Sequence, residues 1–162
     1  MPTIVEKILS RASGGRQVRA GDYLTCDVDL AMVHDSSGPR RLAPKLATLG
    51  MTLKDPDMLA VITDHYVPAH DEASRSIQQL TREWVAAEGV SHYFPEMGIC
   101  HVVLPEQGLV QPGMLIVGGD SHSPTGGAFG AYMFGVGATD MAAVAATGKT
   151  WLKVPRTHLV AL

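Results

Sequence analysis

The sequence predicts an α/β fold, a three-layer α/β/α domain with a mainly parallel sheet. Two continuous apolar runs, Met58–Ile62 and Met114–Val117, are typical of strands that are covered on both faces. Each run ends in an acid and a histidine, in Thr63-Asp64-His65 and in Gly118-Gly119-Asp120-Ser121-His122. Ligands of α/β proteins bind at such strand ends, so these polar groups are the first candidates for a site.

The other elements follow from periodicity and from turn residues. Expected helices cover Thr3–Ala12 with a capping box, Arg40–Leu49 with Pro44 in its first turn, Asp71–Glu88, and Asp140–Ala146. Expected strands cover Leu24–Leu30, where polar and apolar residues alternate, and Thr150–Pro155. The third helix presents one apolar face, made of Ile77, Leu80, Trp84 and Val85, and Gly89 ends it.

Length and composition restrict the class of protein. The 162 residues suffice for one domain, and the strand-like end at His158–Leu162 suggests that this single domain is incomplete. The net charge is −3 with no basic cluster, which argues against a nucleic-acid partner. No apolar run approaches the roughly 18 residues of a membrane span, and the N-terminus lacks a signal-peptide core, so a cytoplasmic location is expected.

Cys26 and Cys100 lie far apart and form no CxxC motif, so we expect buried free thiols. Two cysteines are too few for a Cys₄ zinc site or for the usual ligand set of an iron–sulfur cluster.

Three short motifs fail on inspection. Gly148-Lys149-Thr150 lacks the glycine that a phosphate-binding loop needs at position 143, which is Ala. Gly135-Val136-Gly137 lacks the third glycine of a dinucleotide fingerprint, and no clear strand is expected before it. The stretch Gly119–Ser123 ends in Ser rather than the Gly of a nucleophile elbow.

Histidines paired with acids remain as the chemistry-bearing groups. His34 and Asp35 form a third cluster after the first expected strand, and His101 lies between apolar residues further along. If the three clusters meet at one edge of the sheet, they fit two mechanisms. They could bind a divalent metal for hydrolysis, or they could hold a polyanionic hydroxy acid and protonate its hydroxyl.

Several of these motifs resemble those of the aconitase family, and most closely those of the large subunits of its 3-isopropylmalate dehydratase and homoaconitase branch. The resemblance covers essentially the whole chain. It is carried by Thr63-Asp64-His65, Gly98-Ile99-Cys100-His101, Gly118–His122, Gly135–Asp140 and Ala146–Trp151. The Asp120-Ser121-His122 stretch is the most specific of these matches.

The resemblance implies a hydro-lyase, which moves a hydroxyl between neighbouring carbons of a hydroxy-di- or tricarboxylate through an unsaturated intermediate. It implies that His65, paired with Asp64, protonates the leaving hydroxyl, and that Asp120 and His122 hold the hydroxyl or water with support from His101. His34 takes a substrate-binding position, and Ser121 shapes the loop.

The resemblance also implies a [4Fe–4S] cluster in the complete enzyme, whose free iron polarises the departing oxygen. The cluster ligands of the family do not match Cys26 or Cys100, so no metal ligand is expected in this chain. The expected partners are the remainder of the large subunit and a small subunit, which supply the serine base and the substrate-recognising arginines. The glycines of the 118–127 loop would give room to cluster and substrate.

Two other functions remain open from the residues. One is a metal-dependent hydrolase that uses His65, His101 and His122. The other is a binding or assembly domain without catalytic activity.

Overall fold

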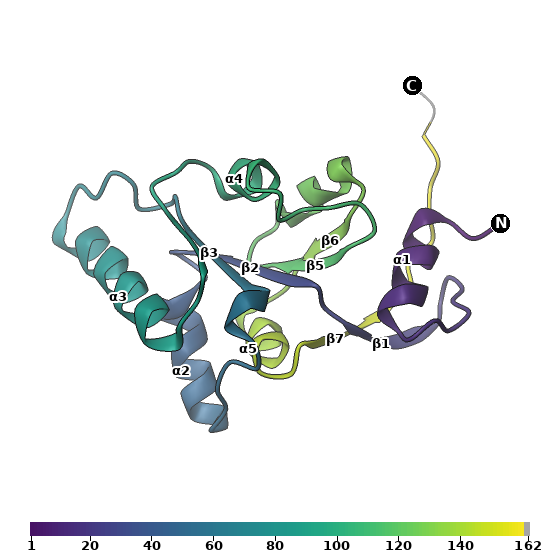
Figure 1. The fold of residues 1–162 in the computed structure, drawn as a ribbon, viewed down its shortest axis with the longest axis horizontal. Helices are drawn as coiled ribbons and strands as arrows, with labels where there is room; N and C mark the ends of the chain where they lie inside the picture. The colour runs from purple at the N-terminus through teal and green to yellow at the C-terminus, as the bar shows by residue number, and fades with distance from the viewer. Residues whose placement is uncertain (161–162) are drawn as a thin grey trace.

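A computed structural model describes residues 1–160 of the chain (Figure 1). The helices are α1 (Ile4–Ala12), α2 (Pro39–Leu49), α3 (Glu72–Glu88), α4 (Cys100–Glu106) and α5 (Ala138–Thr147), with two short 3₁₀ segments, η1 (Pro56–Met58) and η2 (Ser123–Phe129). The strands are β1 (Tyr23–Asp27), β2 (Leu30–His34), β3 (Leu59–Thr63), β4 (His92–Pro95), β5 (Leu115–Gly118), β6 (Tyr132–Gly135) and β7 (Lys149–Lys153).

The main sheet has five strands in the order β4-β3-β2-β5-β6, and every neighbouring pair is parallel. The chain moves outward from β2 to β4, then returns to the other side of β2 with β5. The strand order therefore reverses between β2 and β5, and in open α/β sheets the ligand crevice lies at the carboxyl ends of the strands at that point.

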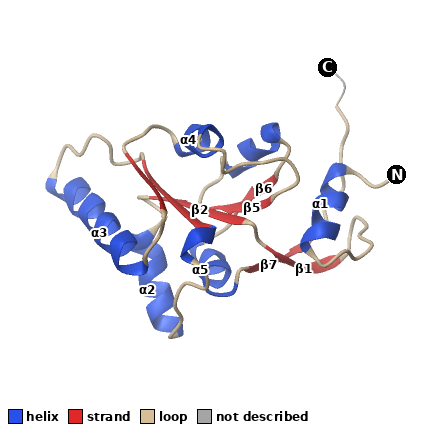
Figure 2. Cartoon of the chain, viewed as in Figure 1, coloured by secondary structure: helices blue, strands red, loops and turns tan. Residues whose placement is uncertain are grey.

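Helices cover both faces of this sheet, as the three-layer prediction requires (Figure 2). Helices α2, α3 and α5 pack on the face that carries Val33, Val61 and Val117. Helix α4 packs on the opposite face with Met32 and Ile62, the same side to which the alternation of β2 directs His34. A parallel sheet covered on both faces explains the continuous apolar runs of the sequence.

A separate two-stranded ribbon lies at one end of the molecule, where β1 pairs antiparallel with β7 and α1 packs on them (Figure 1). The predicted capping box of α1 is present, because Thr3 and Glu6 exchange side-chain and backbone hydrogen bonds. No helix among residues 1–160 is long and apolar enough to cross a membrane.

The single strand expected over Leu24–Leu30 is wrong, because the chain changes sheets inside that range. Strand β1 ends at Asp27 in the ribbon, and β2 begins at Leu30 in the main sheet. Asp29 lies at the crossing, where its carboxylate accepts a hydrogen bond from the Leu115 amide (2.7 Å) and pairs with Arg11. Since β2 is buried along its whole length, alternation could not reveal it.

Three other local expectations need correction. Helix α2 begins at Pro39, so Pro44 lies in its second turn rather than its first. The face of α3 toward the core carries Thr81 and Val85, whereas Leu80 is exposed. Strand β6 does precede Gly135-Val136-Gly137, although the third fingerprint glycine is still missing.

The C-terminal expectations are met only in part. Strand β7 covers Lys149–Lys153, close to the predicted Thr150–Pro155. Residues 158–160 are not in a strand, and residues 161 and 162 lie outside the described part of the chain. Both cysteines are buried free thiols, as predicted.

Candidate active site

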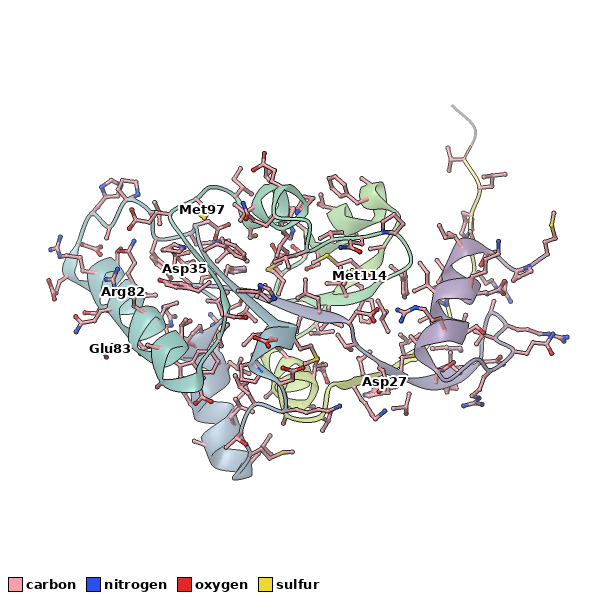
Figure 3. All side chains as sticks on the ribbon, viewed as in Figure 1. Asp27, Asp35, Arg82, Glu83, Met97 and Met114 are labelled. Carbon is pink, nitrogen blue, oxygen red and sulfur yellow. The ribbon has the colours of Figure 1, made fainter. Side chains whose placement is uncertain are left out.

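The carboxyl ends of the three central strands bring the predicted acid and histidine side chains together. His34 ends β2, Asp64 and His65 follow β3, and Asp120 follows β5. In Figure 3, Asp35, which follows β2, lies away from Asp27 on the ribbon and at the same end of the molecule as Met97, in the loop before α4. The polar groups therefore gather beside the β2–β5 switch point, where a parallel sheet presents its ligand crevice.

The first pair is Asp64–His65. The Asp64 carboxylate accepts from His65 Nδ1 at 2.6 Å, so Nε2 is the ring nitrogen that does not face Asp64. The side chain of His65 is 45% exposed, whereas that of Asp64 is 8% exposed. Burial alone would raise the pKa of Asp64, but hydrogen bonds from His65 and from the Cys100 amide outweigh it and lower the pKa. The carboxylate is therefore ionised and can orient a protonated imidazole.

The ring of His34 lies against the His65 ring of this pair. Its ring stacks on the His65 ring with centroids 3.9 Å apart and an interplanar angle of 9°. Ser36 Oγ lies 2.9 Å from Nδ1 of His34, but Nε2 is buried and has no hydrogen-bond partner among residues 1–160. Burial lowers the pKa of His34, and the neighbouring His65 lowers it further. A buried polar nitrogen normally has a hydrogen-bond partner from the protein or from bound water, so Nε2 is an exception among the described residues.

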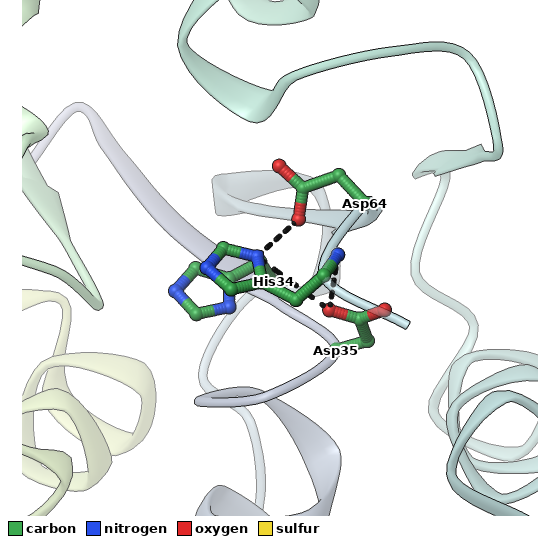
Figure 4. A group of neighbouring side chains, drawn as sticks. His34, Asp35 and Asp64 are labelled. Carbon is green, nitrogen blue, oxygen red and sulfur yellow. Dashed lines mark hydrogen bonds and ion pairs between the residues drawn. The ribbon is translucent and has the colours of Figure 1, made fainter. Parts of the chain in front are cut away.

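Asp35 holds the turn that carries His65. Its two carboxylate oxygens accept from the backbone amides of His65 (3.1 Å) and Tyr66 (3.0 Å). Figure 4 shows the carboxylates of Asp35 and Asp64 on the same side of the stacked rings. Because its side chain is fully buried, Asp35 contributes to the position of His65 rather than to direct ligand contact.

The second pair is His101–Asp120. Nε2 of His101 lies 2.8 Å from Asp120 Oδ2, and Ser123 Oγ donates to Oδ1 at 2.8 Å. Burial would raise the pKa of Asp120, but the hydrogen bonds of His101 and Ser123 lower it. His122 is 81% exposed, with Nδ1 3.8 Å from Asp120 Oδ2, and Ser121 is exposed beside it.

Helix α4 joins the two pairs. Its first residue, Cys100, donates its amide to Asp64 Oδ2 at 2.8 Å, and its second residue, His101, reaches Asp120. Sequence reasoning assigned no element to residues 100–106, because Val102, Val103 and Pro105 are poor helix formers. The helix explains how a histidine between apolar residues enters the site.

Two close contacts shape the loop after β5. A Cβ on Gly118 would lie 1.9 Å from Ser123 Oγ, and one on Gly135 would lie 2.1 Å from the Asp120 carbonyl oxygen. These glycines make room for the protein's own loop. Nothing lies within 4 Å of a Cβ built on Gly127, so this glycine faces open space. Ser123, which the sequence interpretation missed, has one signal: it follows Asp120 by three residues, a spacing that suits a local side-chain bond.

A groove of about 420 Å³ opens beside His65. Asp64 and Thr63 line one part, and Val67, Gly98 and Ile99 line the apolar part.

The geometry of the stacked histidines does not favour a shared metal ion. Donor atoms of His34, Asp35, Asp64 and His65 lie within 4.8 Å of one another. However, the in-plane lone pairs of two nearly parallel rings run side by side and do not converge on one ion. Both oxygens of Asp35 also already accept backbone amides.

Comparison with known proteins matches nearly the whole chain to one family. The model of the aconitase family (aconitate hydratase) matches residues 6–162. The chain is 47% identical over 160 residues to the 3-isopropylmalate dehydratase large subunit 1 of Methanopyrus kandleri, covering 98% of this chain and 38% of that protein. It is 47% identical over 157 residues to a probable methanogen homoaconitase large subunit of Methanothermobacter thermautotrophicus, covering 94% and 37%.

A third relative, the 3-isopropylmalate dehydratase large subunit of Herpetosiphon aurantiacus, is 48% identical over 157 residues, covering 96% of this chain and 37% of that protein. The chain thus spans a little over a third of the length of these relatives. The family match extends over nearly every described residue, and the chain belongs to the aconitase family.

Proposed function

We propose that residues 1–162 form one wall of the active site of a hydro-lyase that dehydrates and rehydrates a hydroxy-di- or tricarboxylate. The candidate substrates are 3-isopropylmalate, a homoaconitate-type acid or a related alkylmalate. The observation that carries the proposal is the pair of His–Asp contacts, Asp64–His65 and His101–Asp120, at the carboxyl edge of the sheet. The names of the relatives favour the same reaction class.

The reaction divides into steps for this chain and for other residues. Dehydration breaks the C–O bond of the hydroxyl and removes a proton from the neighbouring carbon, and the electron pair of that C–H bond forms the double bond. His65 donates the proton that turns the departing hydroxyl into water, and ionised Asp64 stabilises the charged imidazole. The base that takes the carbon-bound proton lies outside residues 1–162.

The second pair holds the oxygen that leaves or returns. Asp120 accepts from His101 and Ser123, so its carboxylate is ionised and held in one orientation. His122 is exposed next to it and can contact the hydroxyl or water. His34 lies beneath His65 with its Nε2 buried, and Ser121 contributes to the loop that carries Asp120 and His122.

The thiols of this chain do not fit a [4Fe–4S] cluster, which the family suggests for the complete enzyme. Cys26 on β1 packs with residues of α1, whereas Cys100, the first residue of α4, packs with residues of the main sheet, in a different part of the core. Burial raises the pKa of both, whereas cluster ligands are thiolates. A cluster in the complete enzyme would therefore take its ligands from residues outside this chain. When bound, it would supply a Lewis acid for the leaving oxygen.

The proposed partners are the remainder of a large subunit and a small subunit, in keeping with the subunit names of the relatives. Neither nucleic acid nor membrane is a proposed partner, and the cytoplasmic location stays a prediction.

The test uses the full-length large subunit that carries residues 1–162, purified without oxygen together with its small subunit. Each candidate acid is added, and the ultraviolet absorbance of the unsaturated product is followed. We expect the double bond to form with at least one of them, and we expect residues 1–162 alone to be inactive. The proposal fails if no candidate acid yields an unsaturated product, or if residues 1–162 alone catalyse the reaction.

A metal-dependent hydrolase that uses His65, His101 and His122 has less support. Among residues 1–160, His65 and His101 fall in two separate groups of potential ligands, and His122 belongs to neither group. Elemental analysis that finds one equivalent of a divalent metal, lost in a His65→Asn variant, would favour it instead.

A further inference from the structure

We propose that His34 is a positioning residue for His65: its buried ring is the platform on which the catalytic imidazole stacks, and it remains neutral while His65 carries the proton. This inference rests on the proposed function of His65. It assigns to His34 a role that acts through another side chain.

The geometry of the two rings supports a platform. The centroids are 3.9 Å apart and the planes differ by 9°, so the rings lie face to face. One ring is exposed and the other is buried, since the side chain of His65 is 45% exposed and His34 is 3% exposed. A hydrogen bond at Nδ1 fixes only one atom of an exposed imidazole, whereas a stacked ring also restricts the plane of that imidazole.

The platform itself is anchored on three sides. His34 ends the fully buried central strand β2, and its backbone amide donates to Ser37 Oγ at 3.4 Å. Ser36 Oγ bonds Nδ1 of the ring at 2.9 Å. Since Asp35, the next residue, holds the amides of His65 and Tyr66, the same turn positions the ring of His34 and the backbone of His65.

The charges around the stack favour one proton rather than two. Asp35, Asp64 and Asp120 are the carboxylates that face His34, and His65 is the facing group that can become a cation. Asp64 bonds His65 directly, so a protonated His65 ring has a carboxylate partner. A second proton on His34 would put a like charge 3.9 Å away inside the protein, where burial already opposes it. His34 therefore supports the acid without competing for its proton.

Two substitutions separate stacking from hydrogen bonding. His34→Phe keeps a flat ring beneath His65 and removes both ring nitrogens, whereas His34→Gln keeps polar atoms and removes the stack. His92→Gln is the matched control, because His92 begins β4, at the amino end of that strand and away from the carboxyl ends that carry the site. The thermal midpoint of each variant shows whether it folds.

The first measurement needs no activity. In residues 1–162, NMR spectra of the His65 ring protons report the stack, because a neighbouring aromatic ring shifts them. We expect this shift to persist in His34→Phe and to vanish in His34→Gln, with no change in His92→Gln. If the His65 ring signals of a folded His34→Gln variant match those of the unsubstituted chain, the platform does not exist.

The second measurement uses the full-length enzyme with its small subunit. Misplacement of a reacting group by about 1 Å costs on the order of 100-fold in rate, so we expect His34→Gln to lower kcat by about 10-fold or more. His34→Phe should keep kcat closer to that of the unsubstituted enzyme, because the stacked ring remains beneath His65. Equal loss of kcat in both variants would overturn the inference. If instead His65→Asn keeps full activity, the proposed function of His65 is wrong. The NMR measurement still shows whether the His34 ring stacks on the His65 ring.

Discussion

The loop after β5 offers a sharp test of how the site is held, through the substitution Gly118→Ala. The new Cβ would lie 1.9 Å from Ser123 Oγ and 2.7 Å from Ser123 Cβ, in a fully buried strand. Neither atom can move away freely, because Ser123 is buried and its hydroxyl donates hydrogen bonds to both the carbonyl and the carboxylate of Asp120. The substitution therefore forces the 3₁₀ segment η2 away from β5.

The magnitude follows from two costs. Overpacking of a dense core costs about 1–3 kcal/mol, and losing a hydrogen bond to a charged group costs about 1.5–3 kcal/mol. Since the loop relaxes in part, we expect a loss of roughly 3 kcal/mol in the free energy of unfolding. For a chain of this size, that lowers Tm by roughly 6–12 °C.

Thermal unfolding of residues 1–162, followed by circular dichroism, measures this loss. Gly127→Ala is the matched control, because nothing lies within 4 Å of its Cβ and its backbone is not in the left-handed region. We expect Gly127→Ala to change the free energy of unfolding by less than about 0.5 kcal/mol. A Gly118→Ala variant with the Tm of the control would refute the packing described for Ser123 and Asp120.

Other predictions concern charge and reactivity. Asp64 and Asp120 have lowered pKa values in the folded chain. As pH falls, their carboxylates are therefore protonated in the unfolded chain before they are protonated in the folded chain. Their stabilisation is complete above the ordinary value of 3.8 and is lost as pH falls through the folded pKa, which urea unfolding at several pH values will show. The pKa of His34 is also lowered, so stability decreases as pH falls below 6.5, and His34→Gln should remove this part of the dependence. Asp120→Asn weakens the charge-assisted bond to His101 and should cost about 1–3 kcal/mol in denaturant titration, and an unchanged midpoint would contradict it. Cys100 is buried, with its pKa raised by burial and by Asp64, so mass spectrometry should find it alkylated only after unfolding.

The strand ends could be predicted from the sequence because a strand that is buried on both faces is a continuous apolar run. The apolar runs before Asp64 and Asp120 became β3 and β5, and the polar residues after them meet at one edge. Parallel neighbours require such convergence once the strand order is known. The order itself, with β2 between β3 and β5, is a tertiary property that no local pattern encodes.

Other parts of the site were hidden for identifiable reasons. Strand β2 was merged with β1 because Val28 and Asp29 continue the alternation while the chain changes sheets. The stack of His34 on His65 joins side chains from two strands, and Asp35 looks like an ordinary turn acid until its bonds to two amides of another loop are seen. The loop glycines were expected to make room for a cluster and substrate, but Gly118 makes room for Ser123.

The most direct test of the central claim compares two histidines in the full-length enzyme with its small subunit. His65→Asn removes the proposed acid of the Asp64 pair, whereas His92→Asn changes a histidine at the amino end of β4, away from the carboxyl ends that carry the site. General acid catalysis contributes about 10²–10⁴-fold, so kcat for double-bond formation should fall by at least about 100-fold in His65→Asn and stay unchanged in His92→Asn. If both variants keep the rate of the unsubstituted enzyme, His65 is not the acid and the proposed site is wrong.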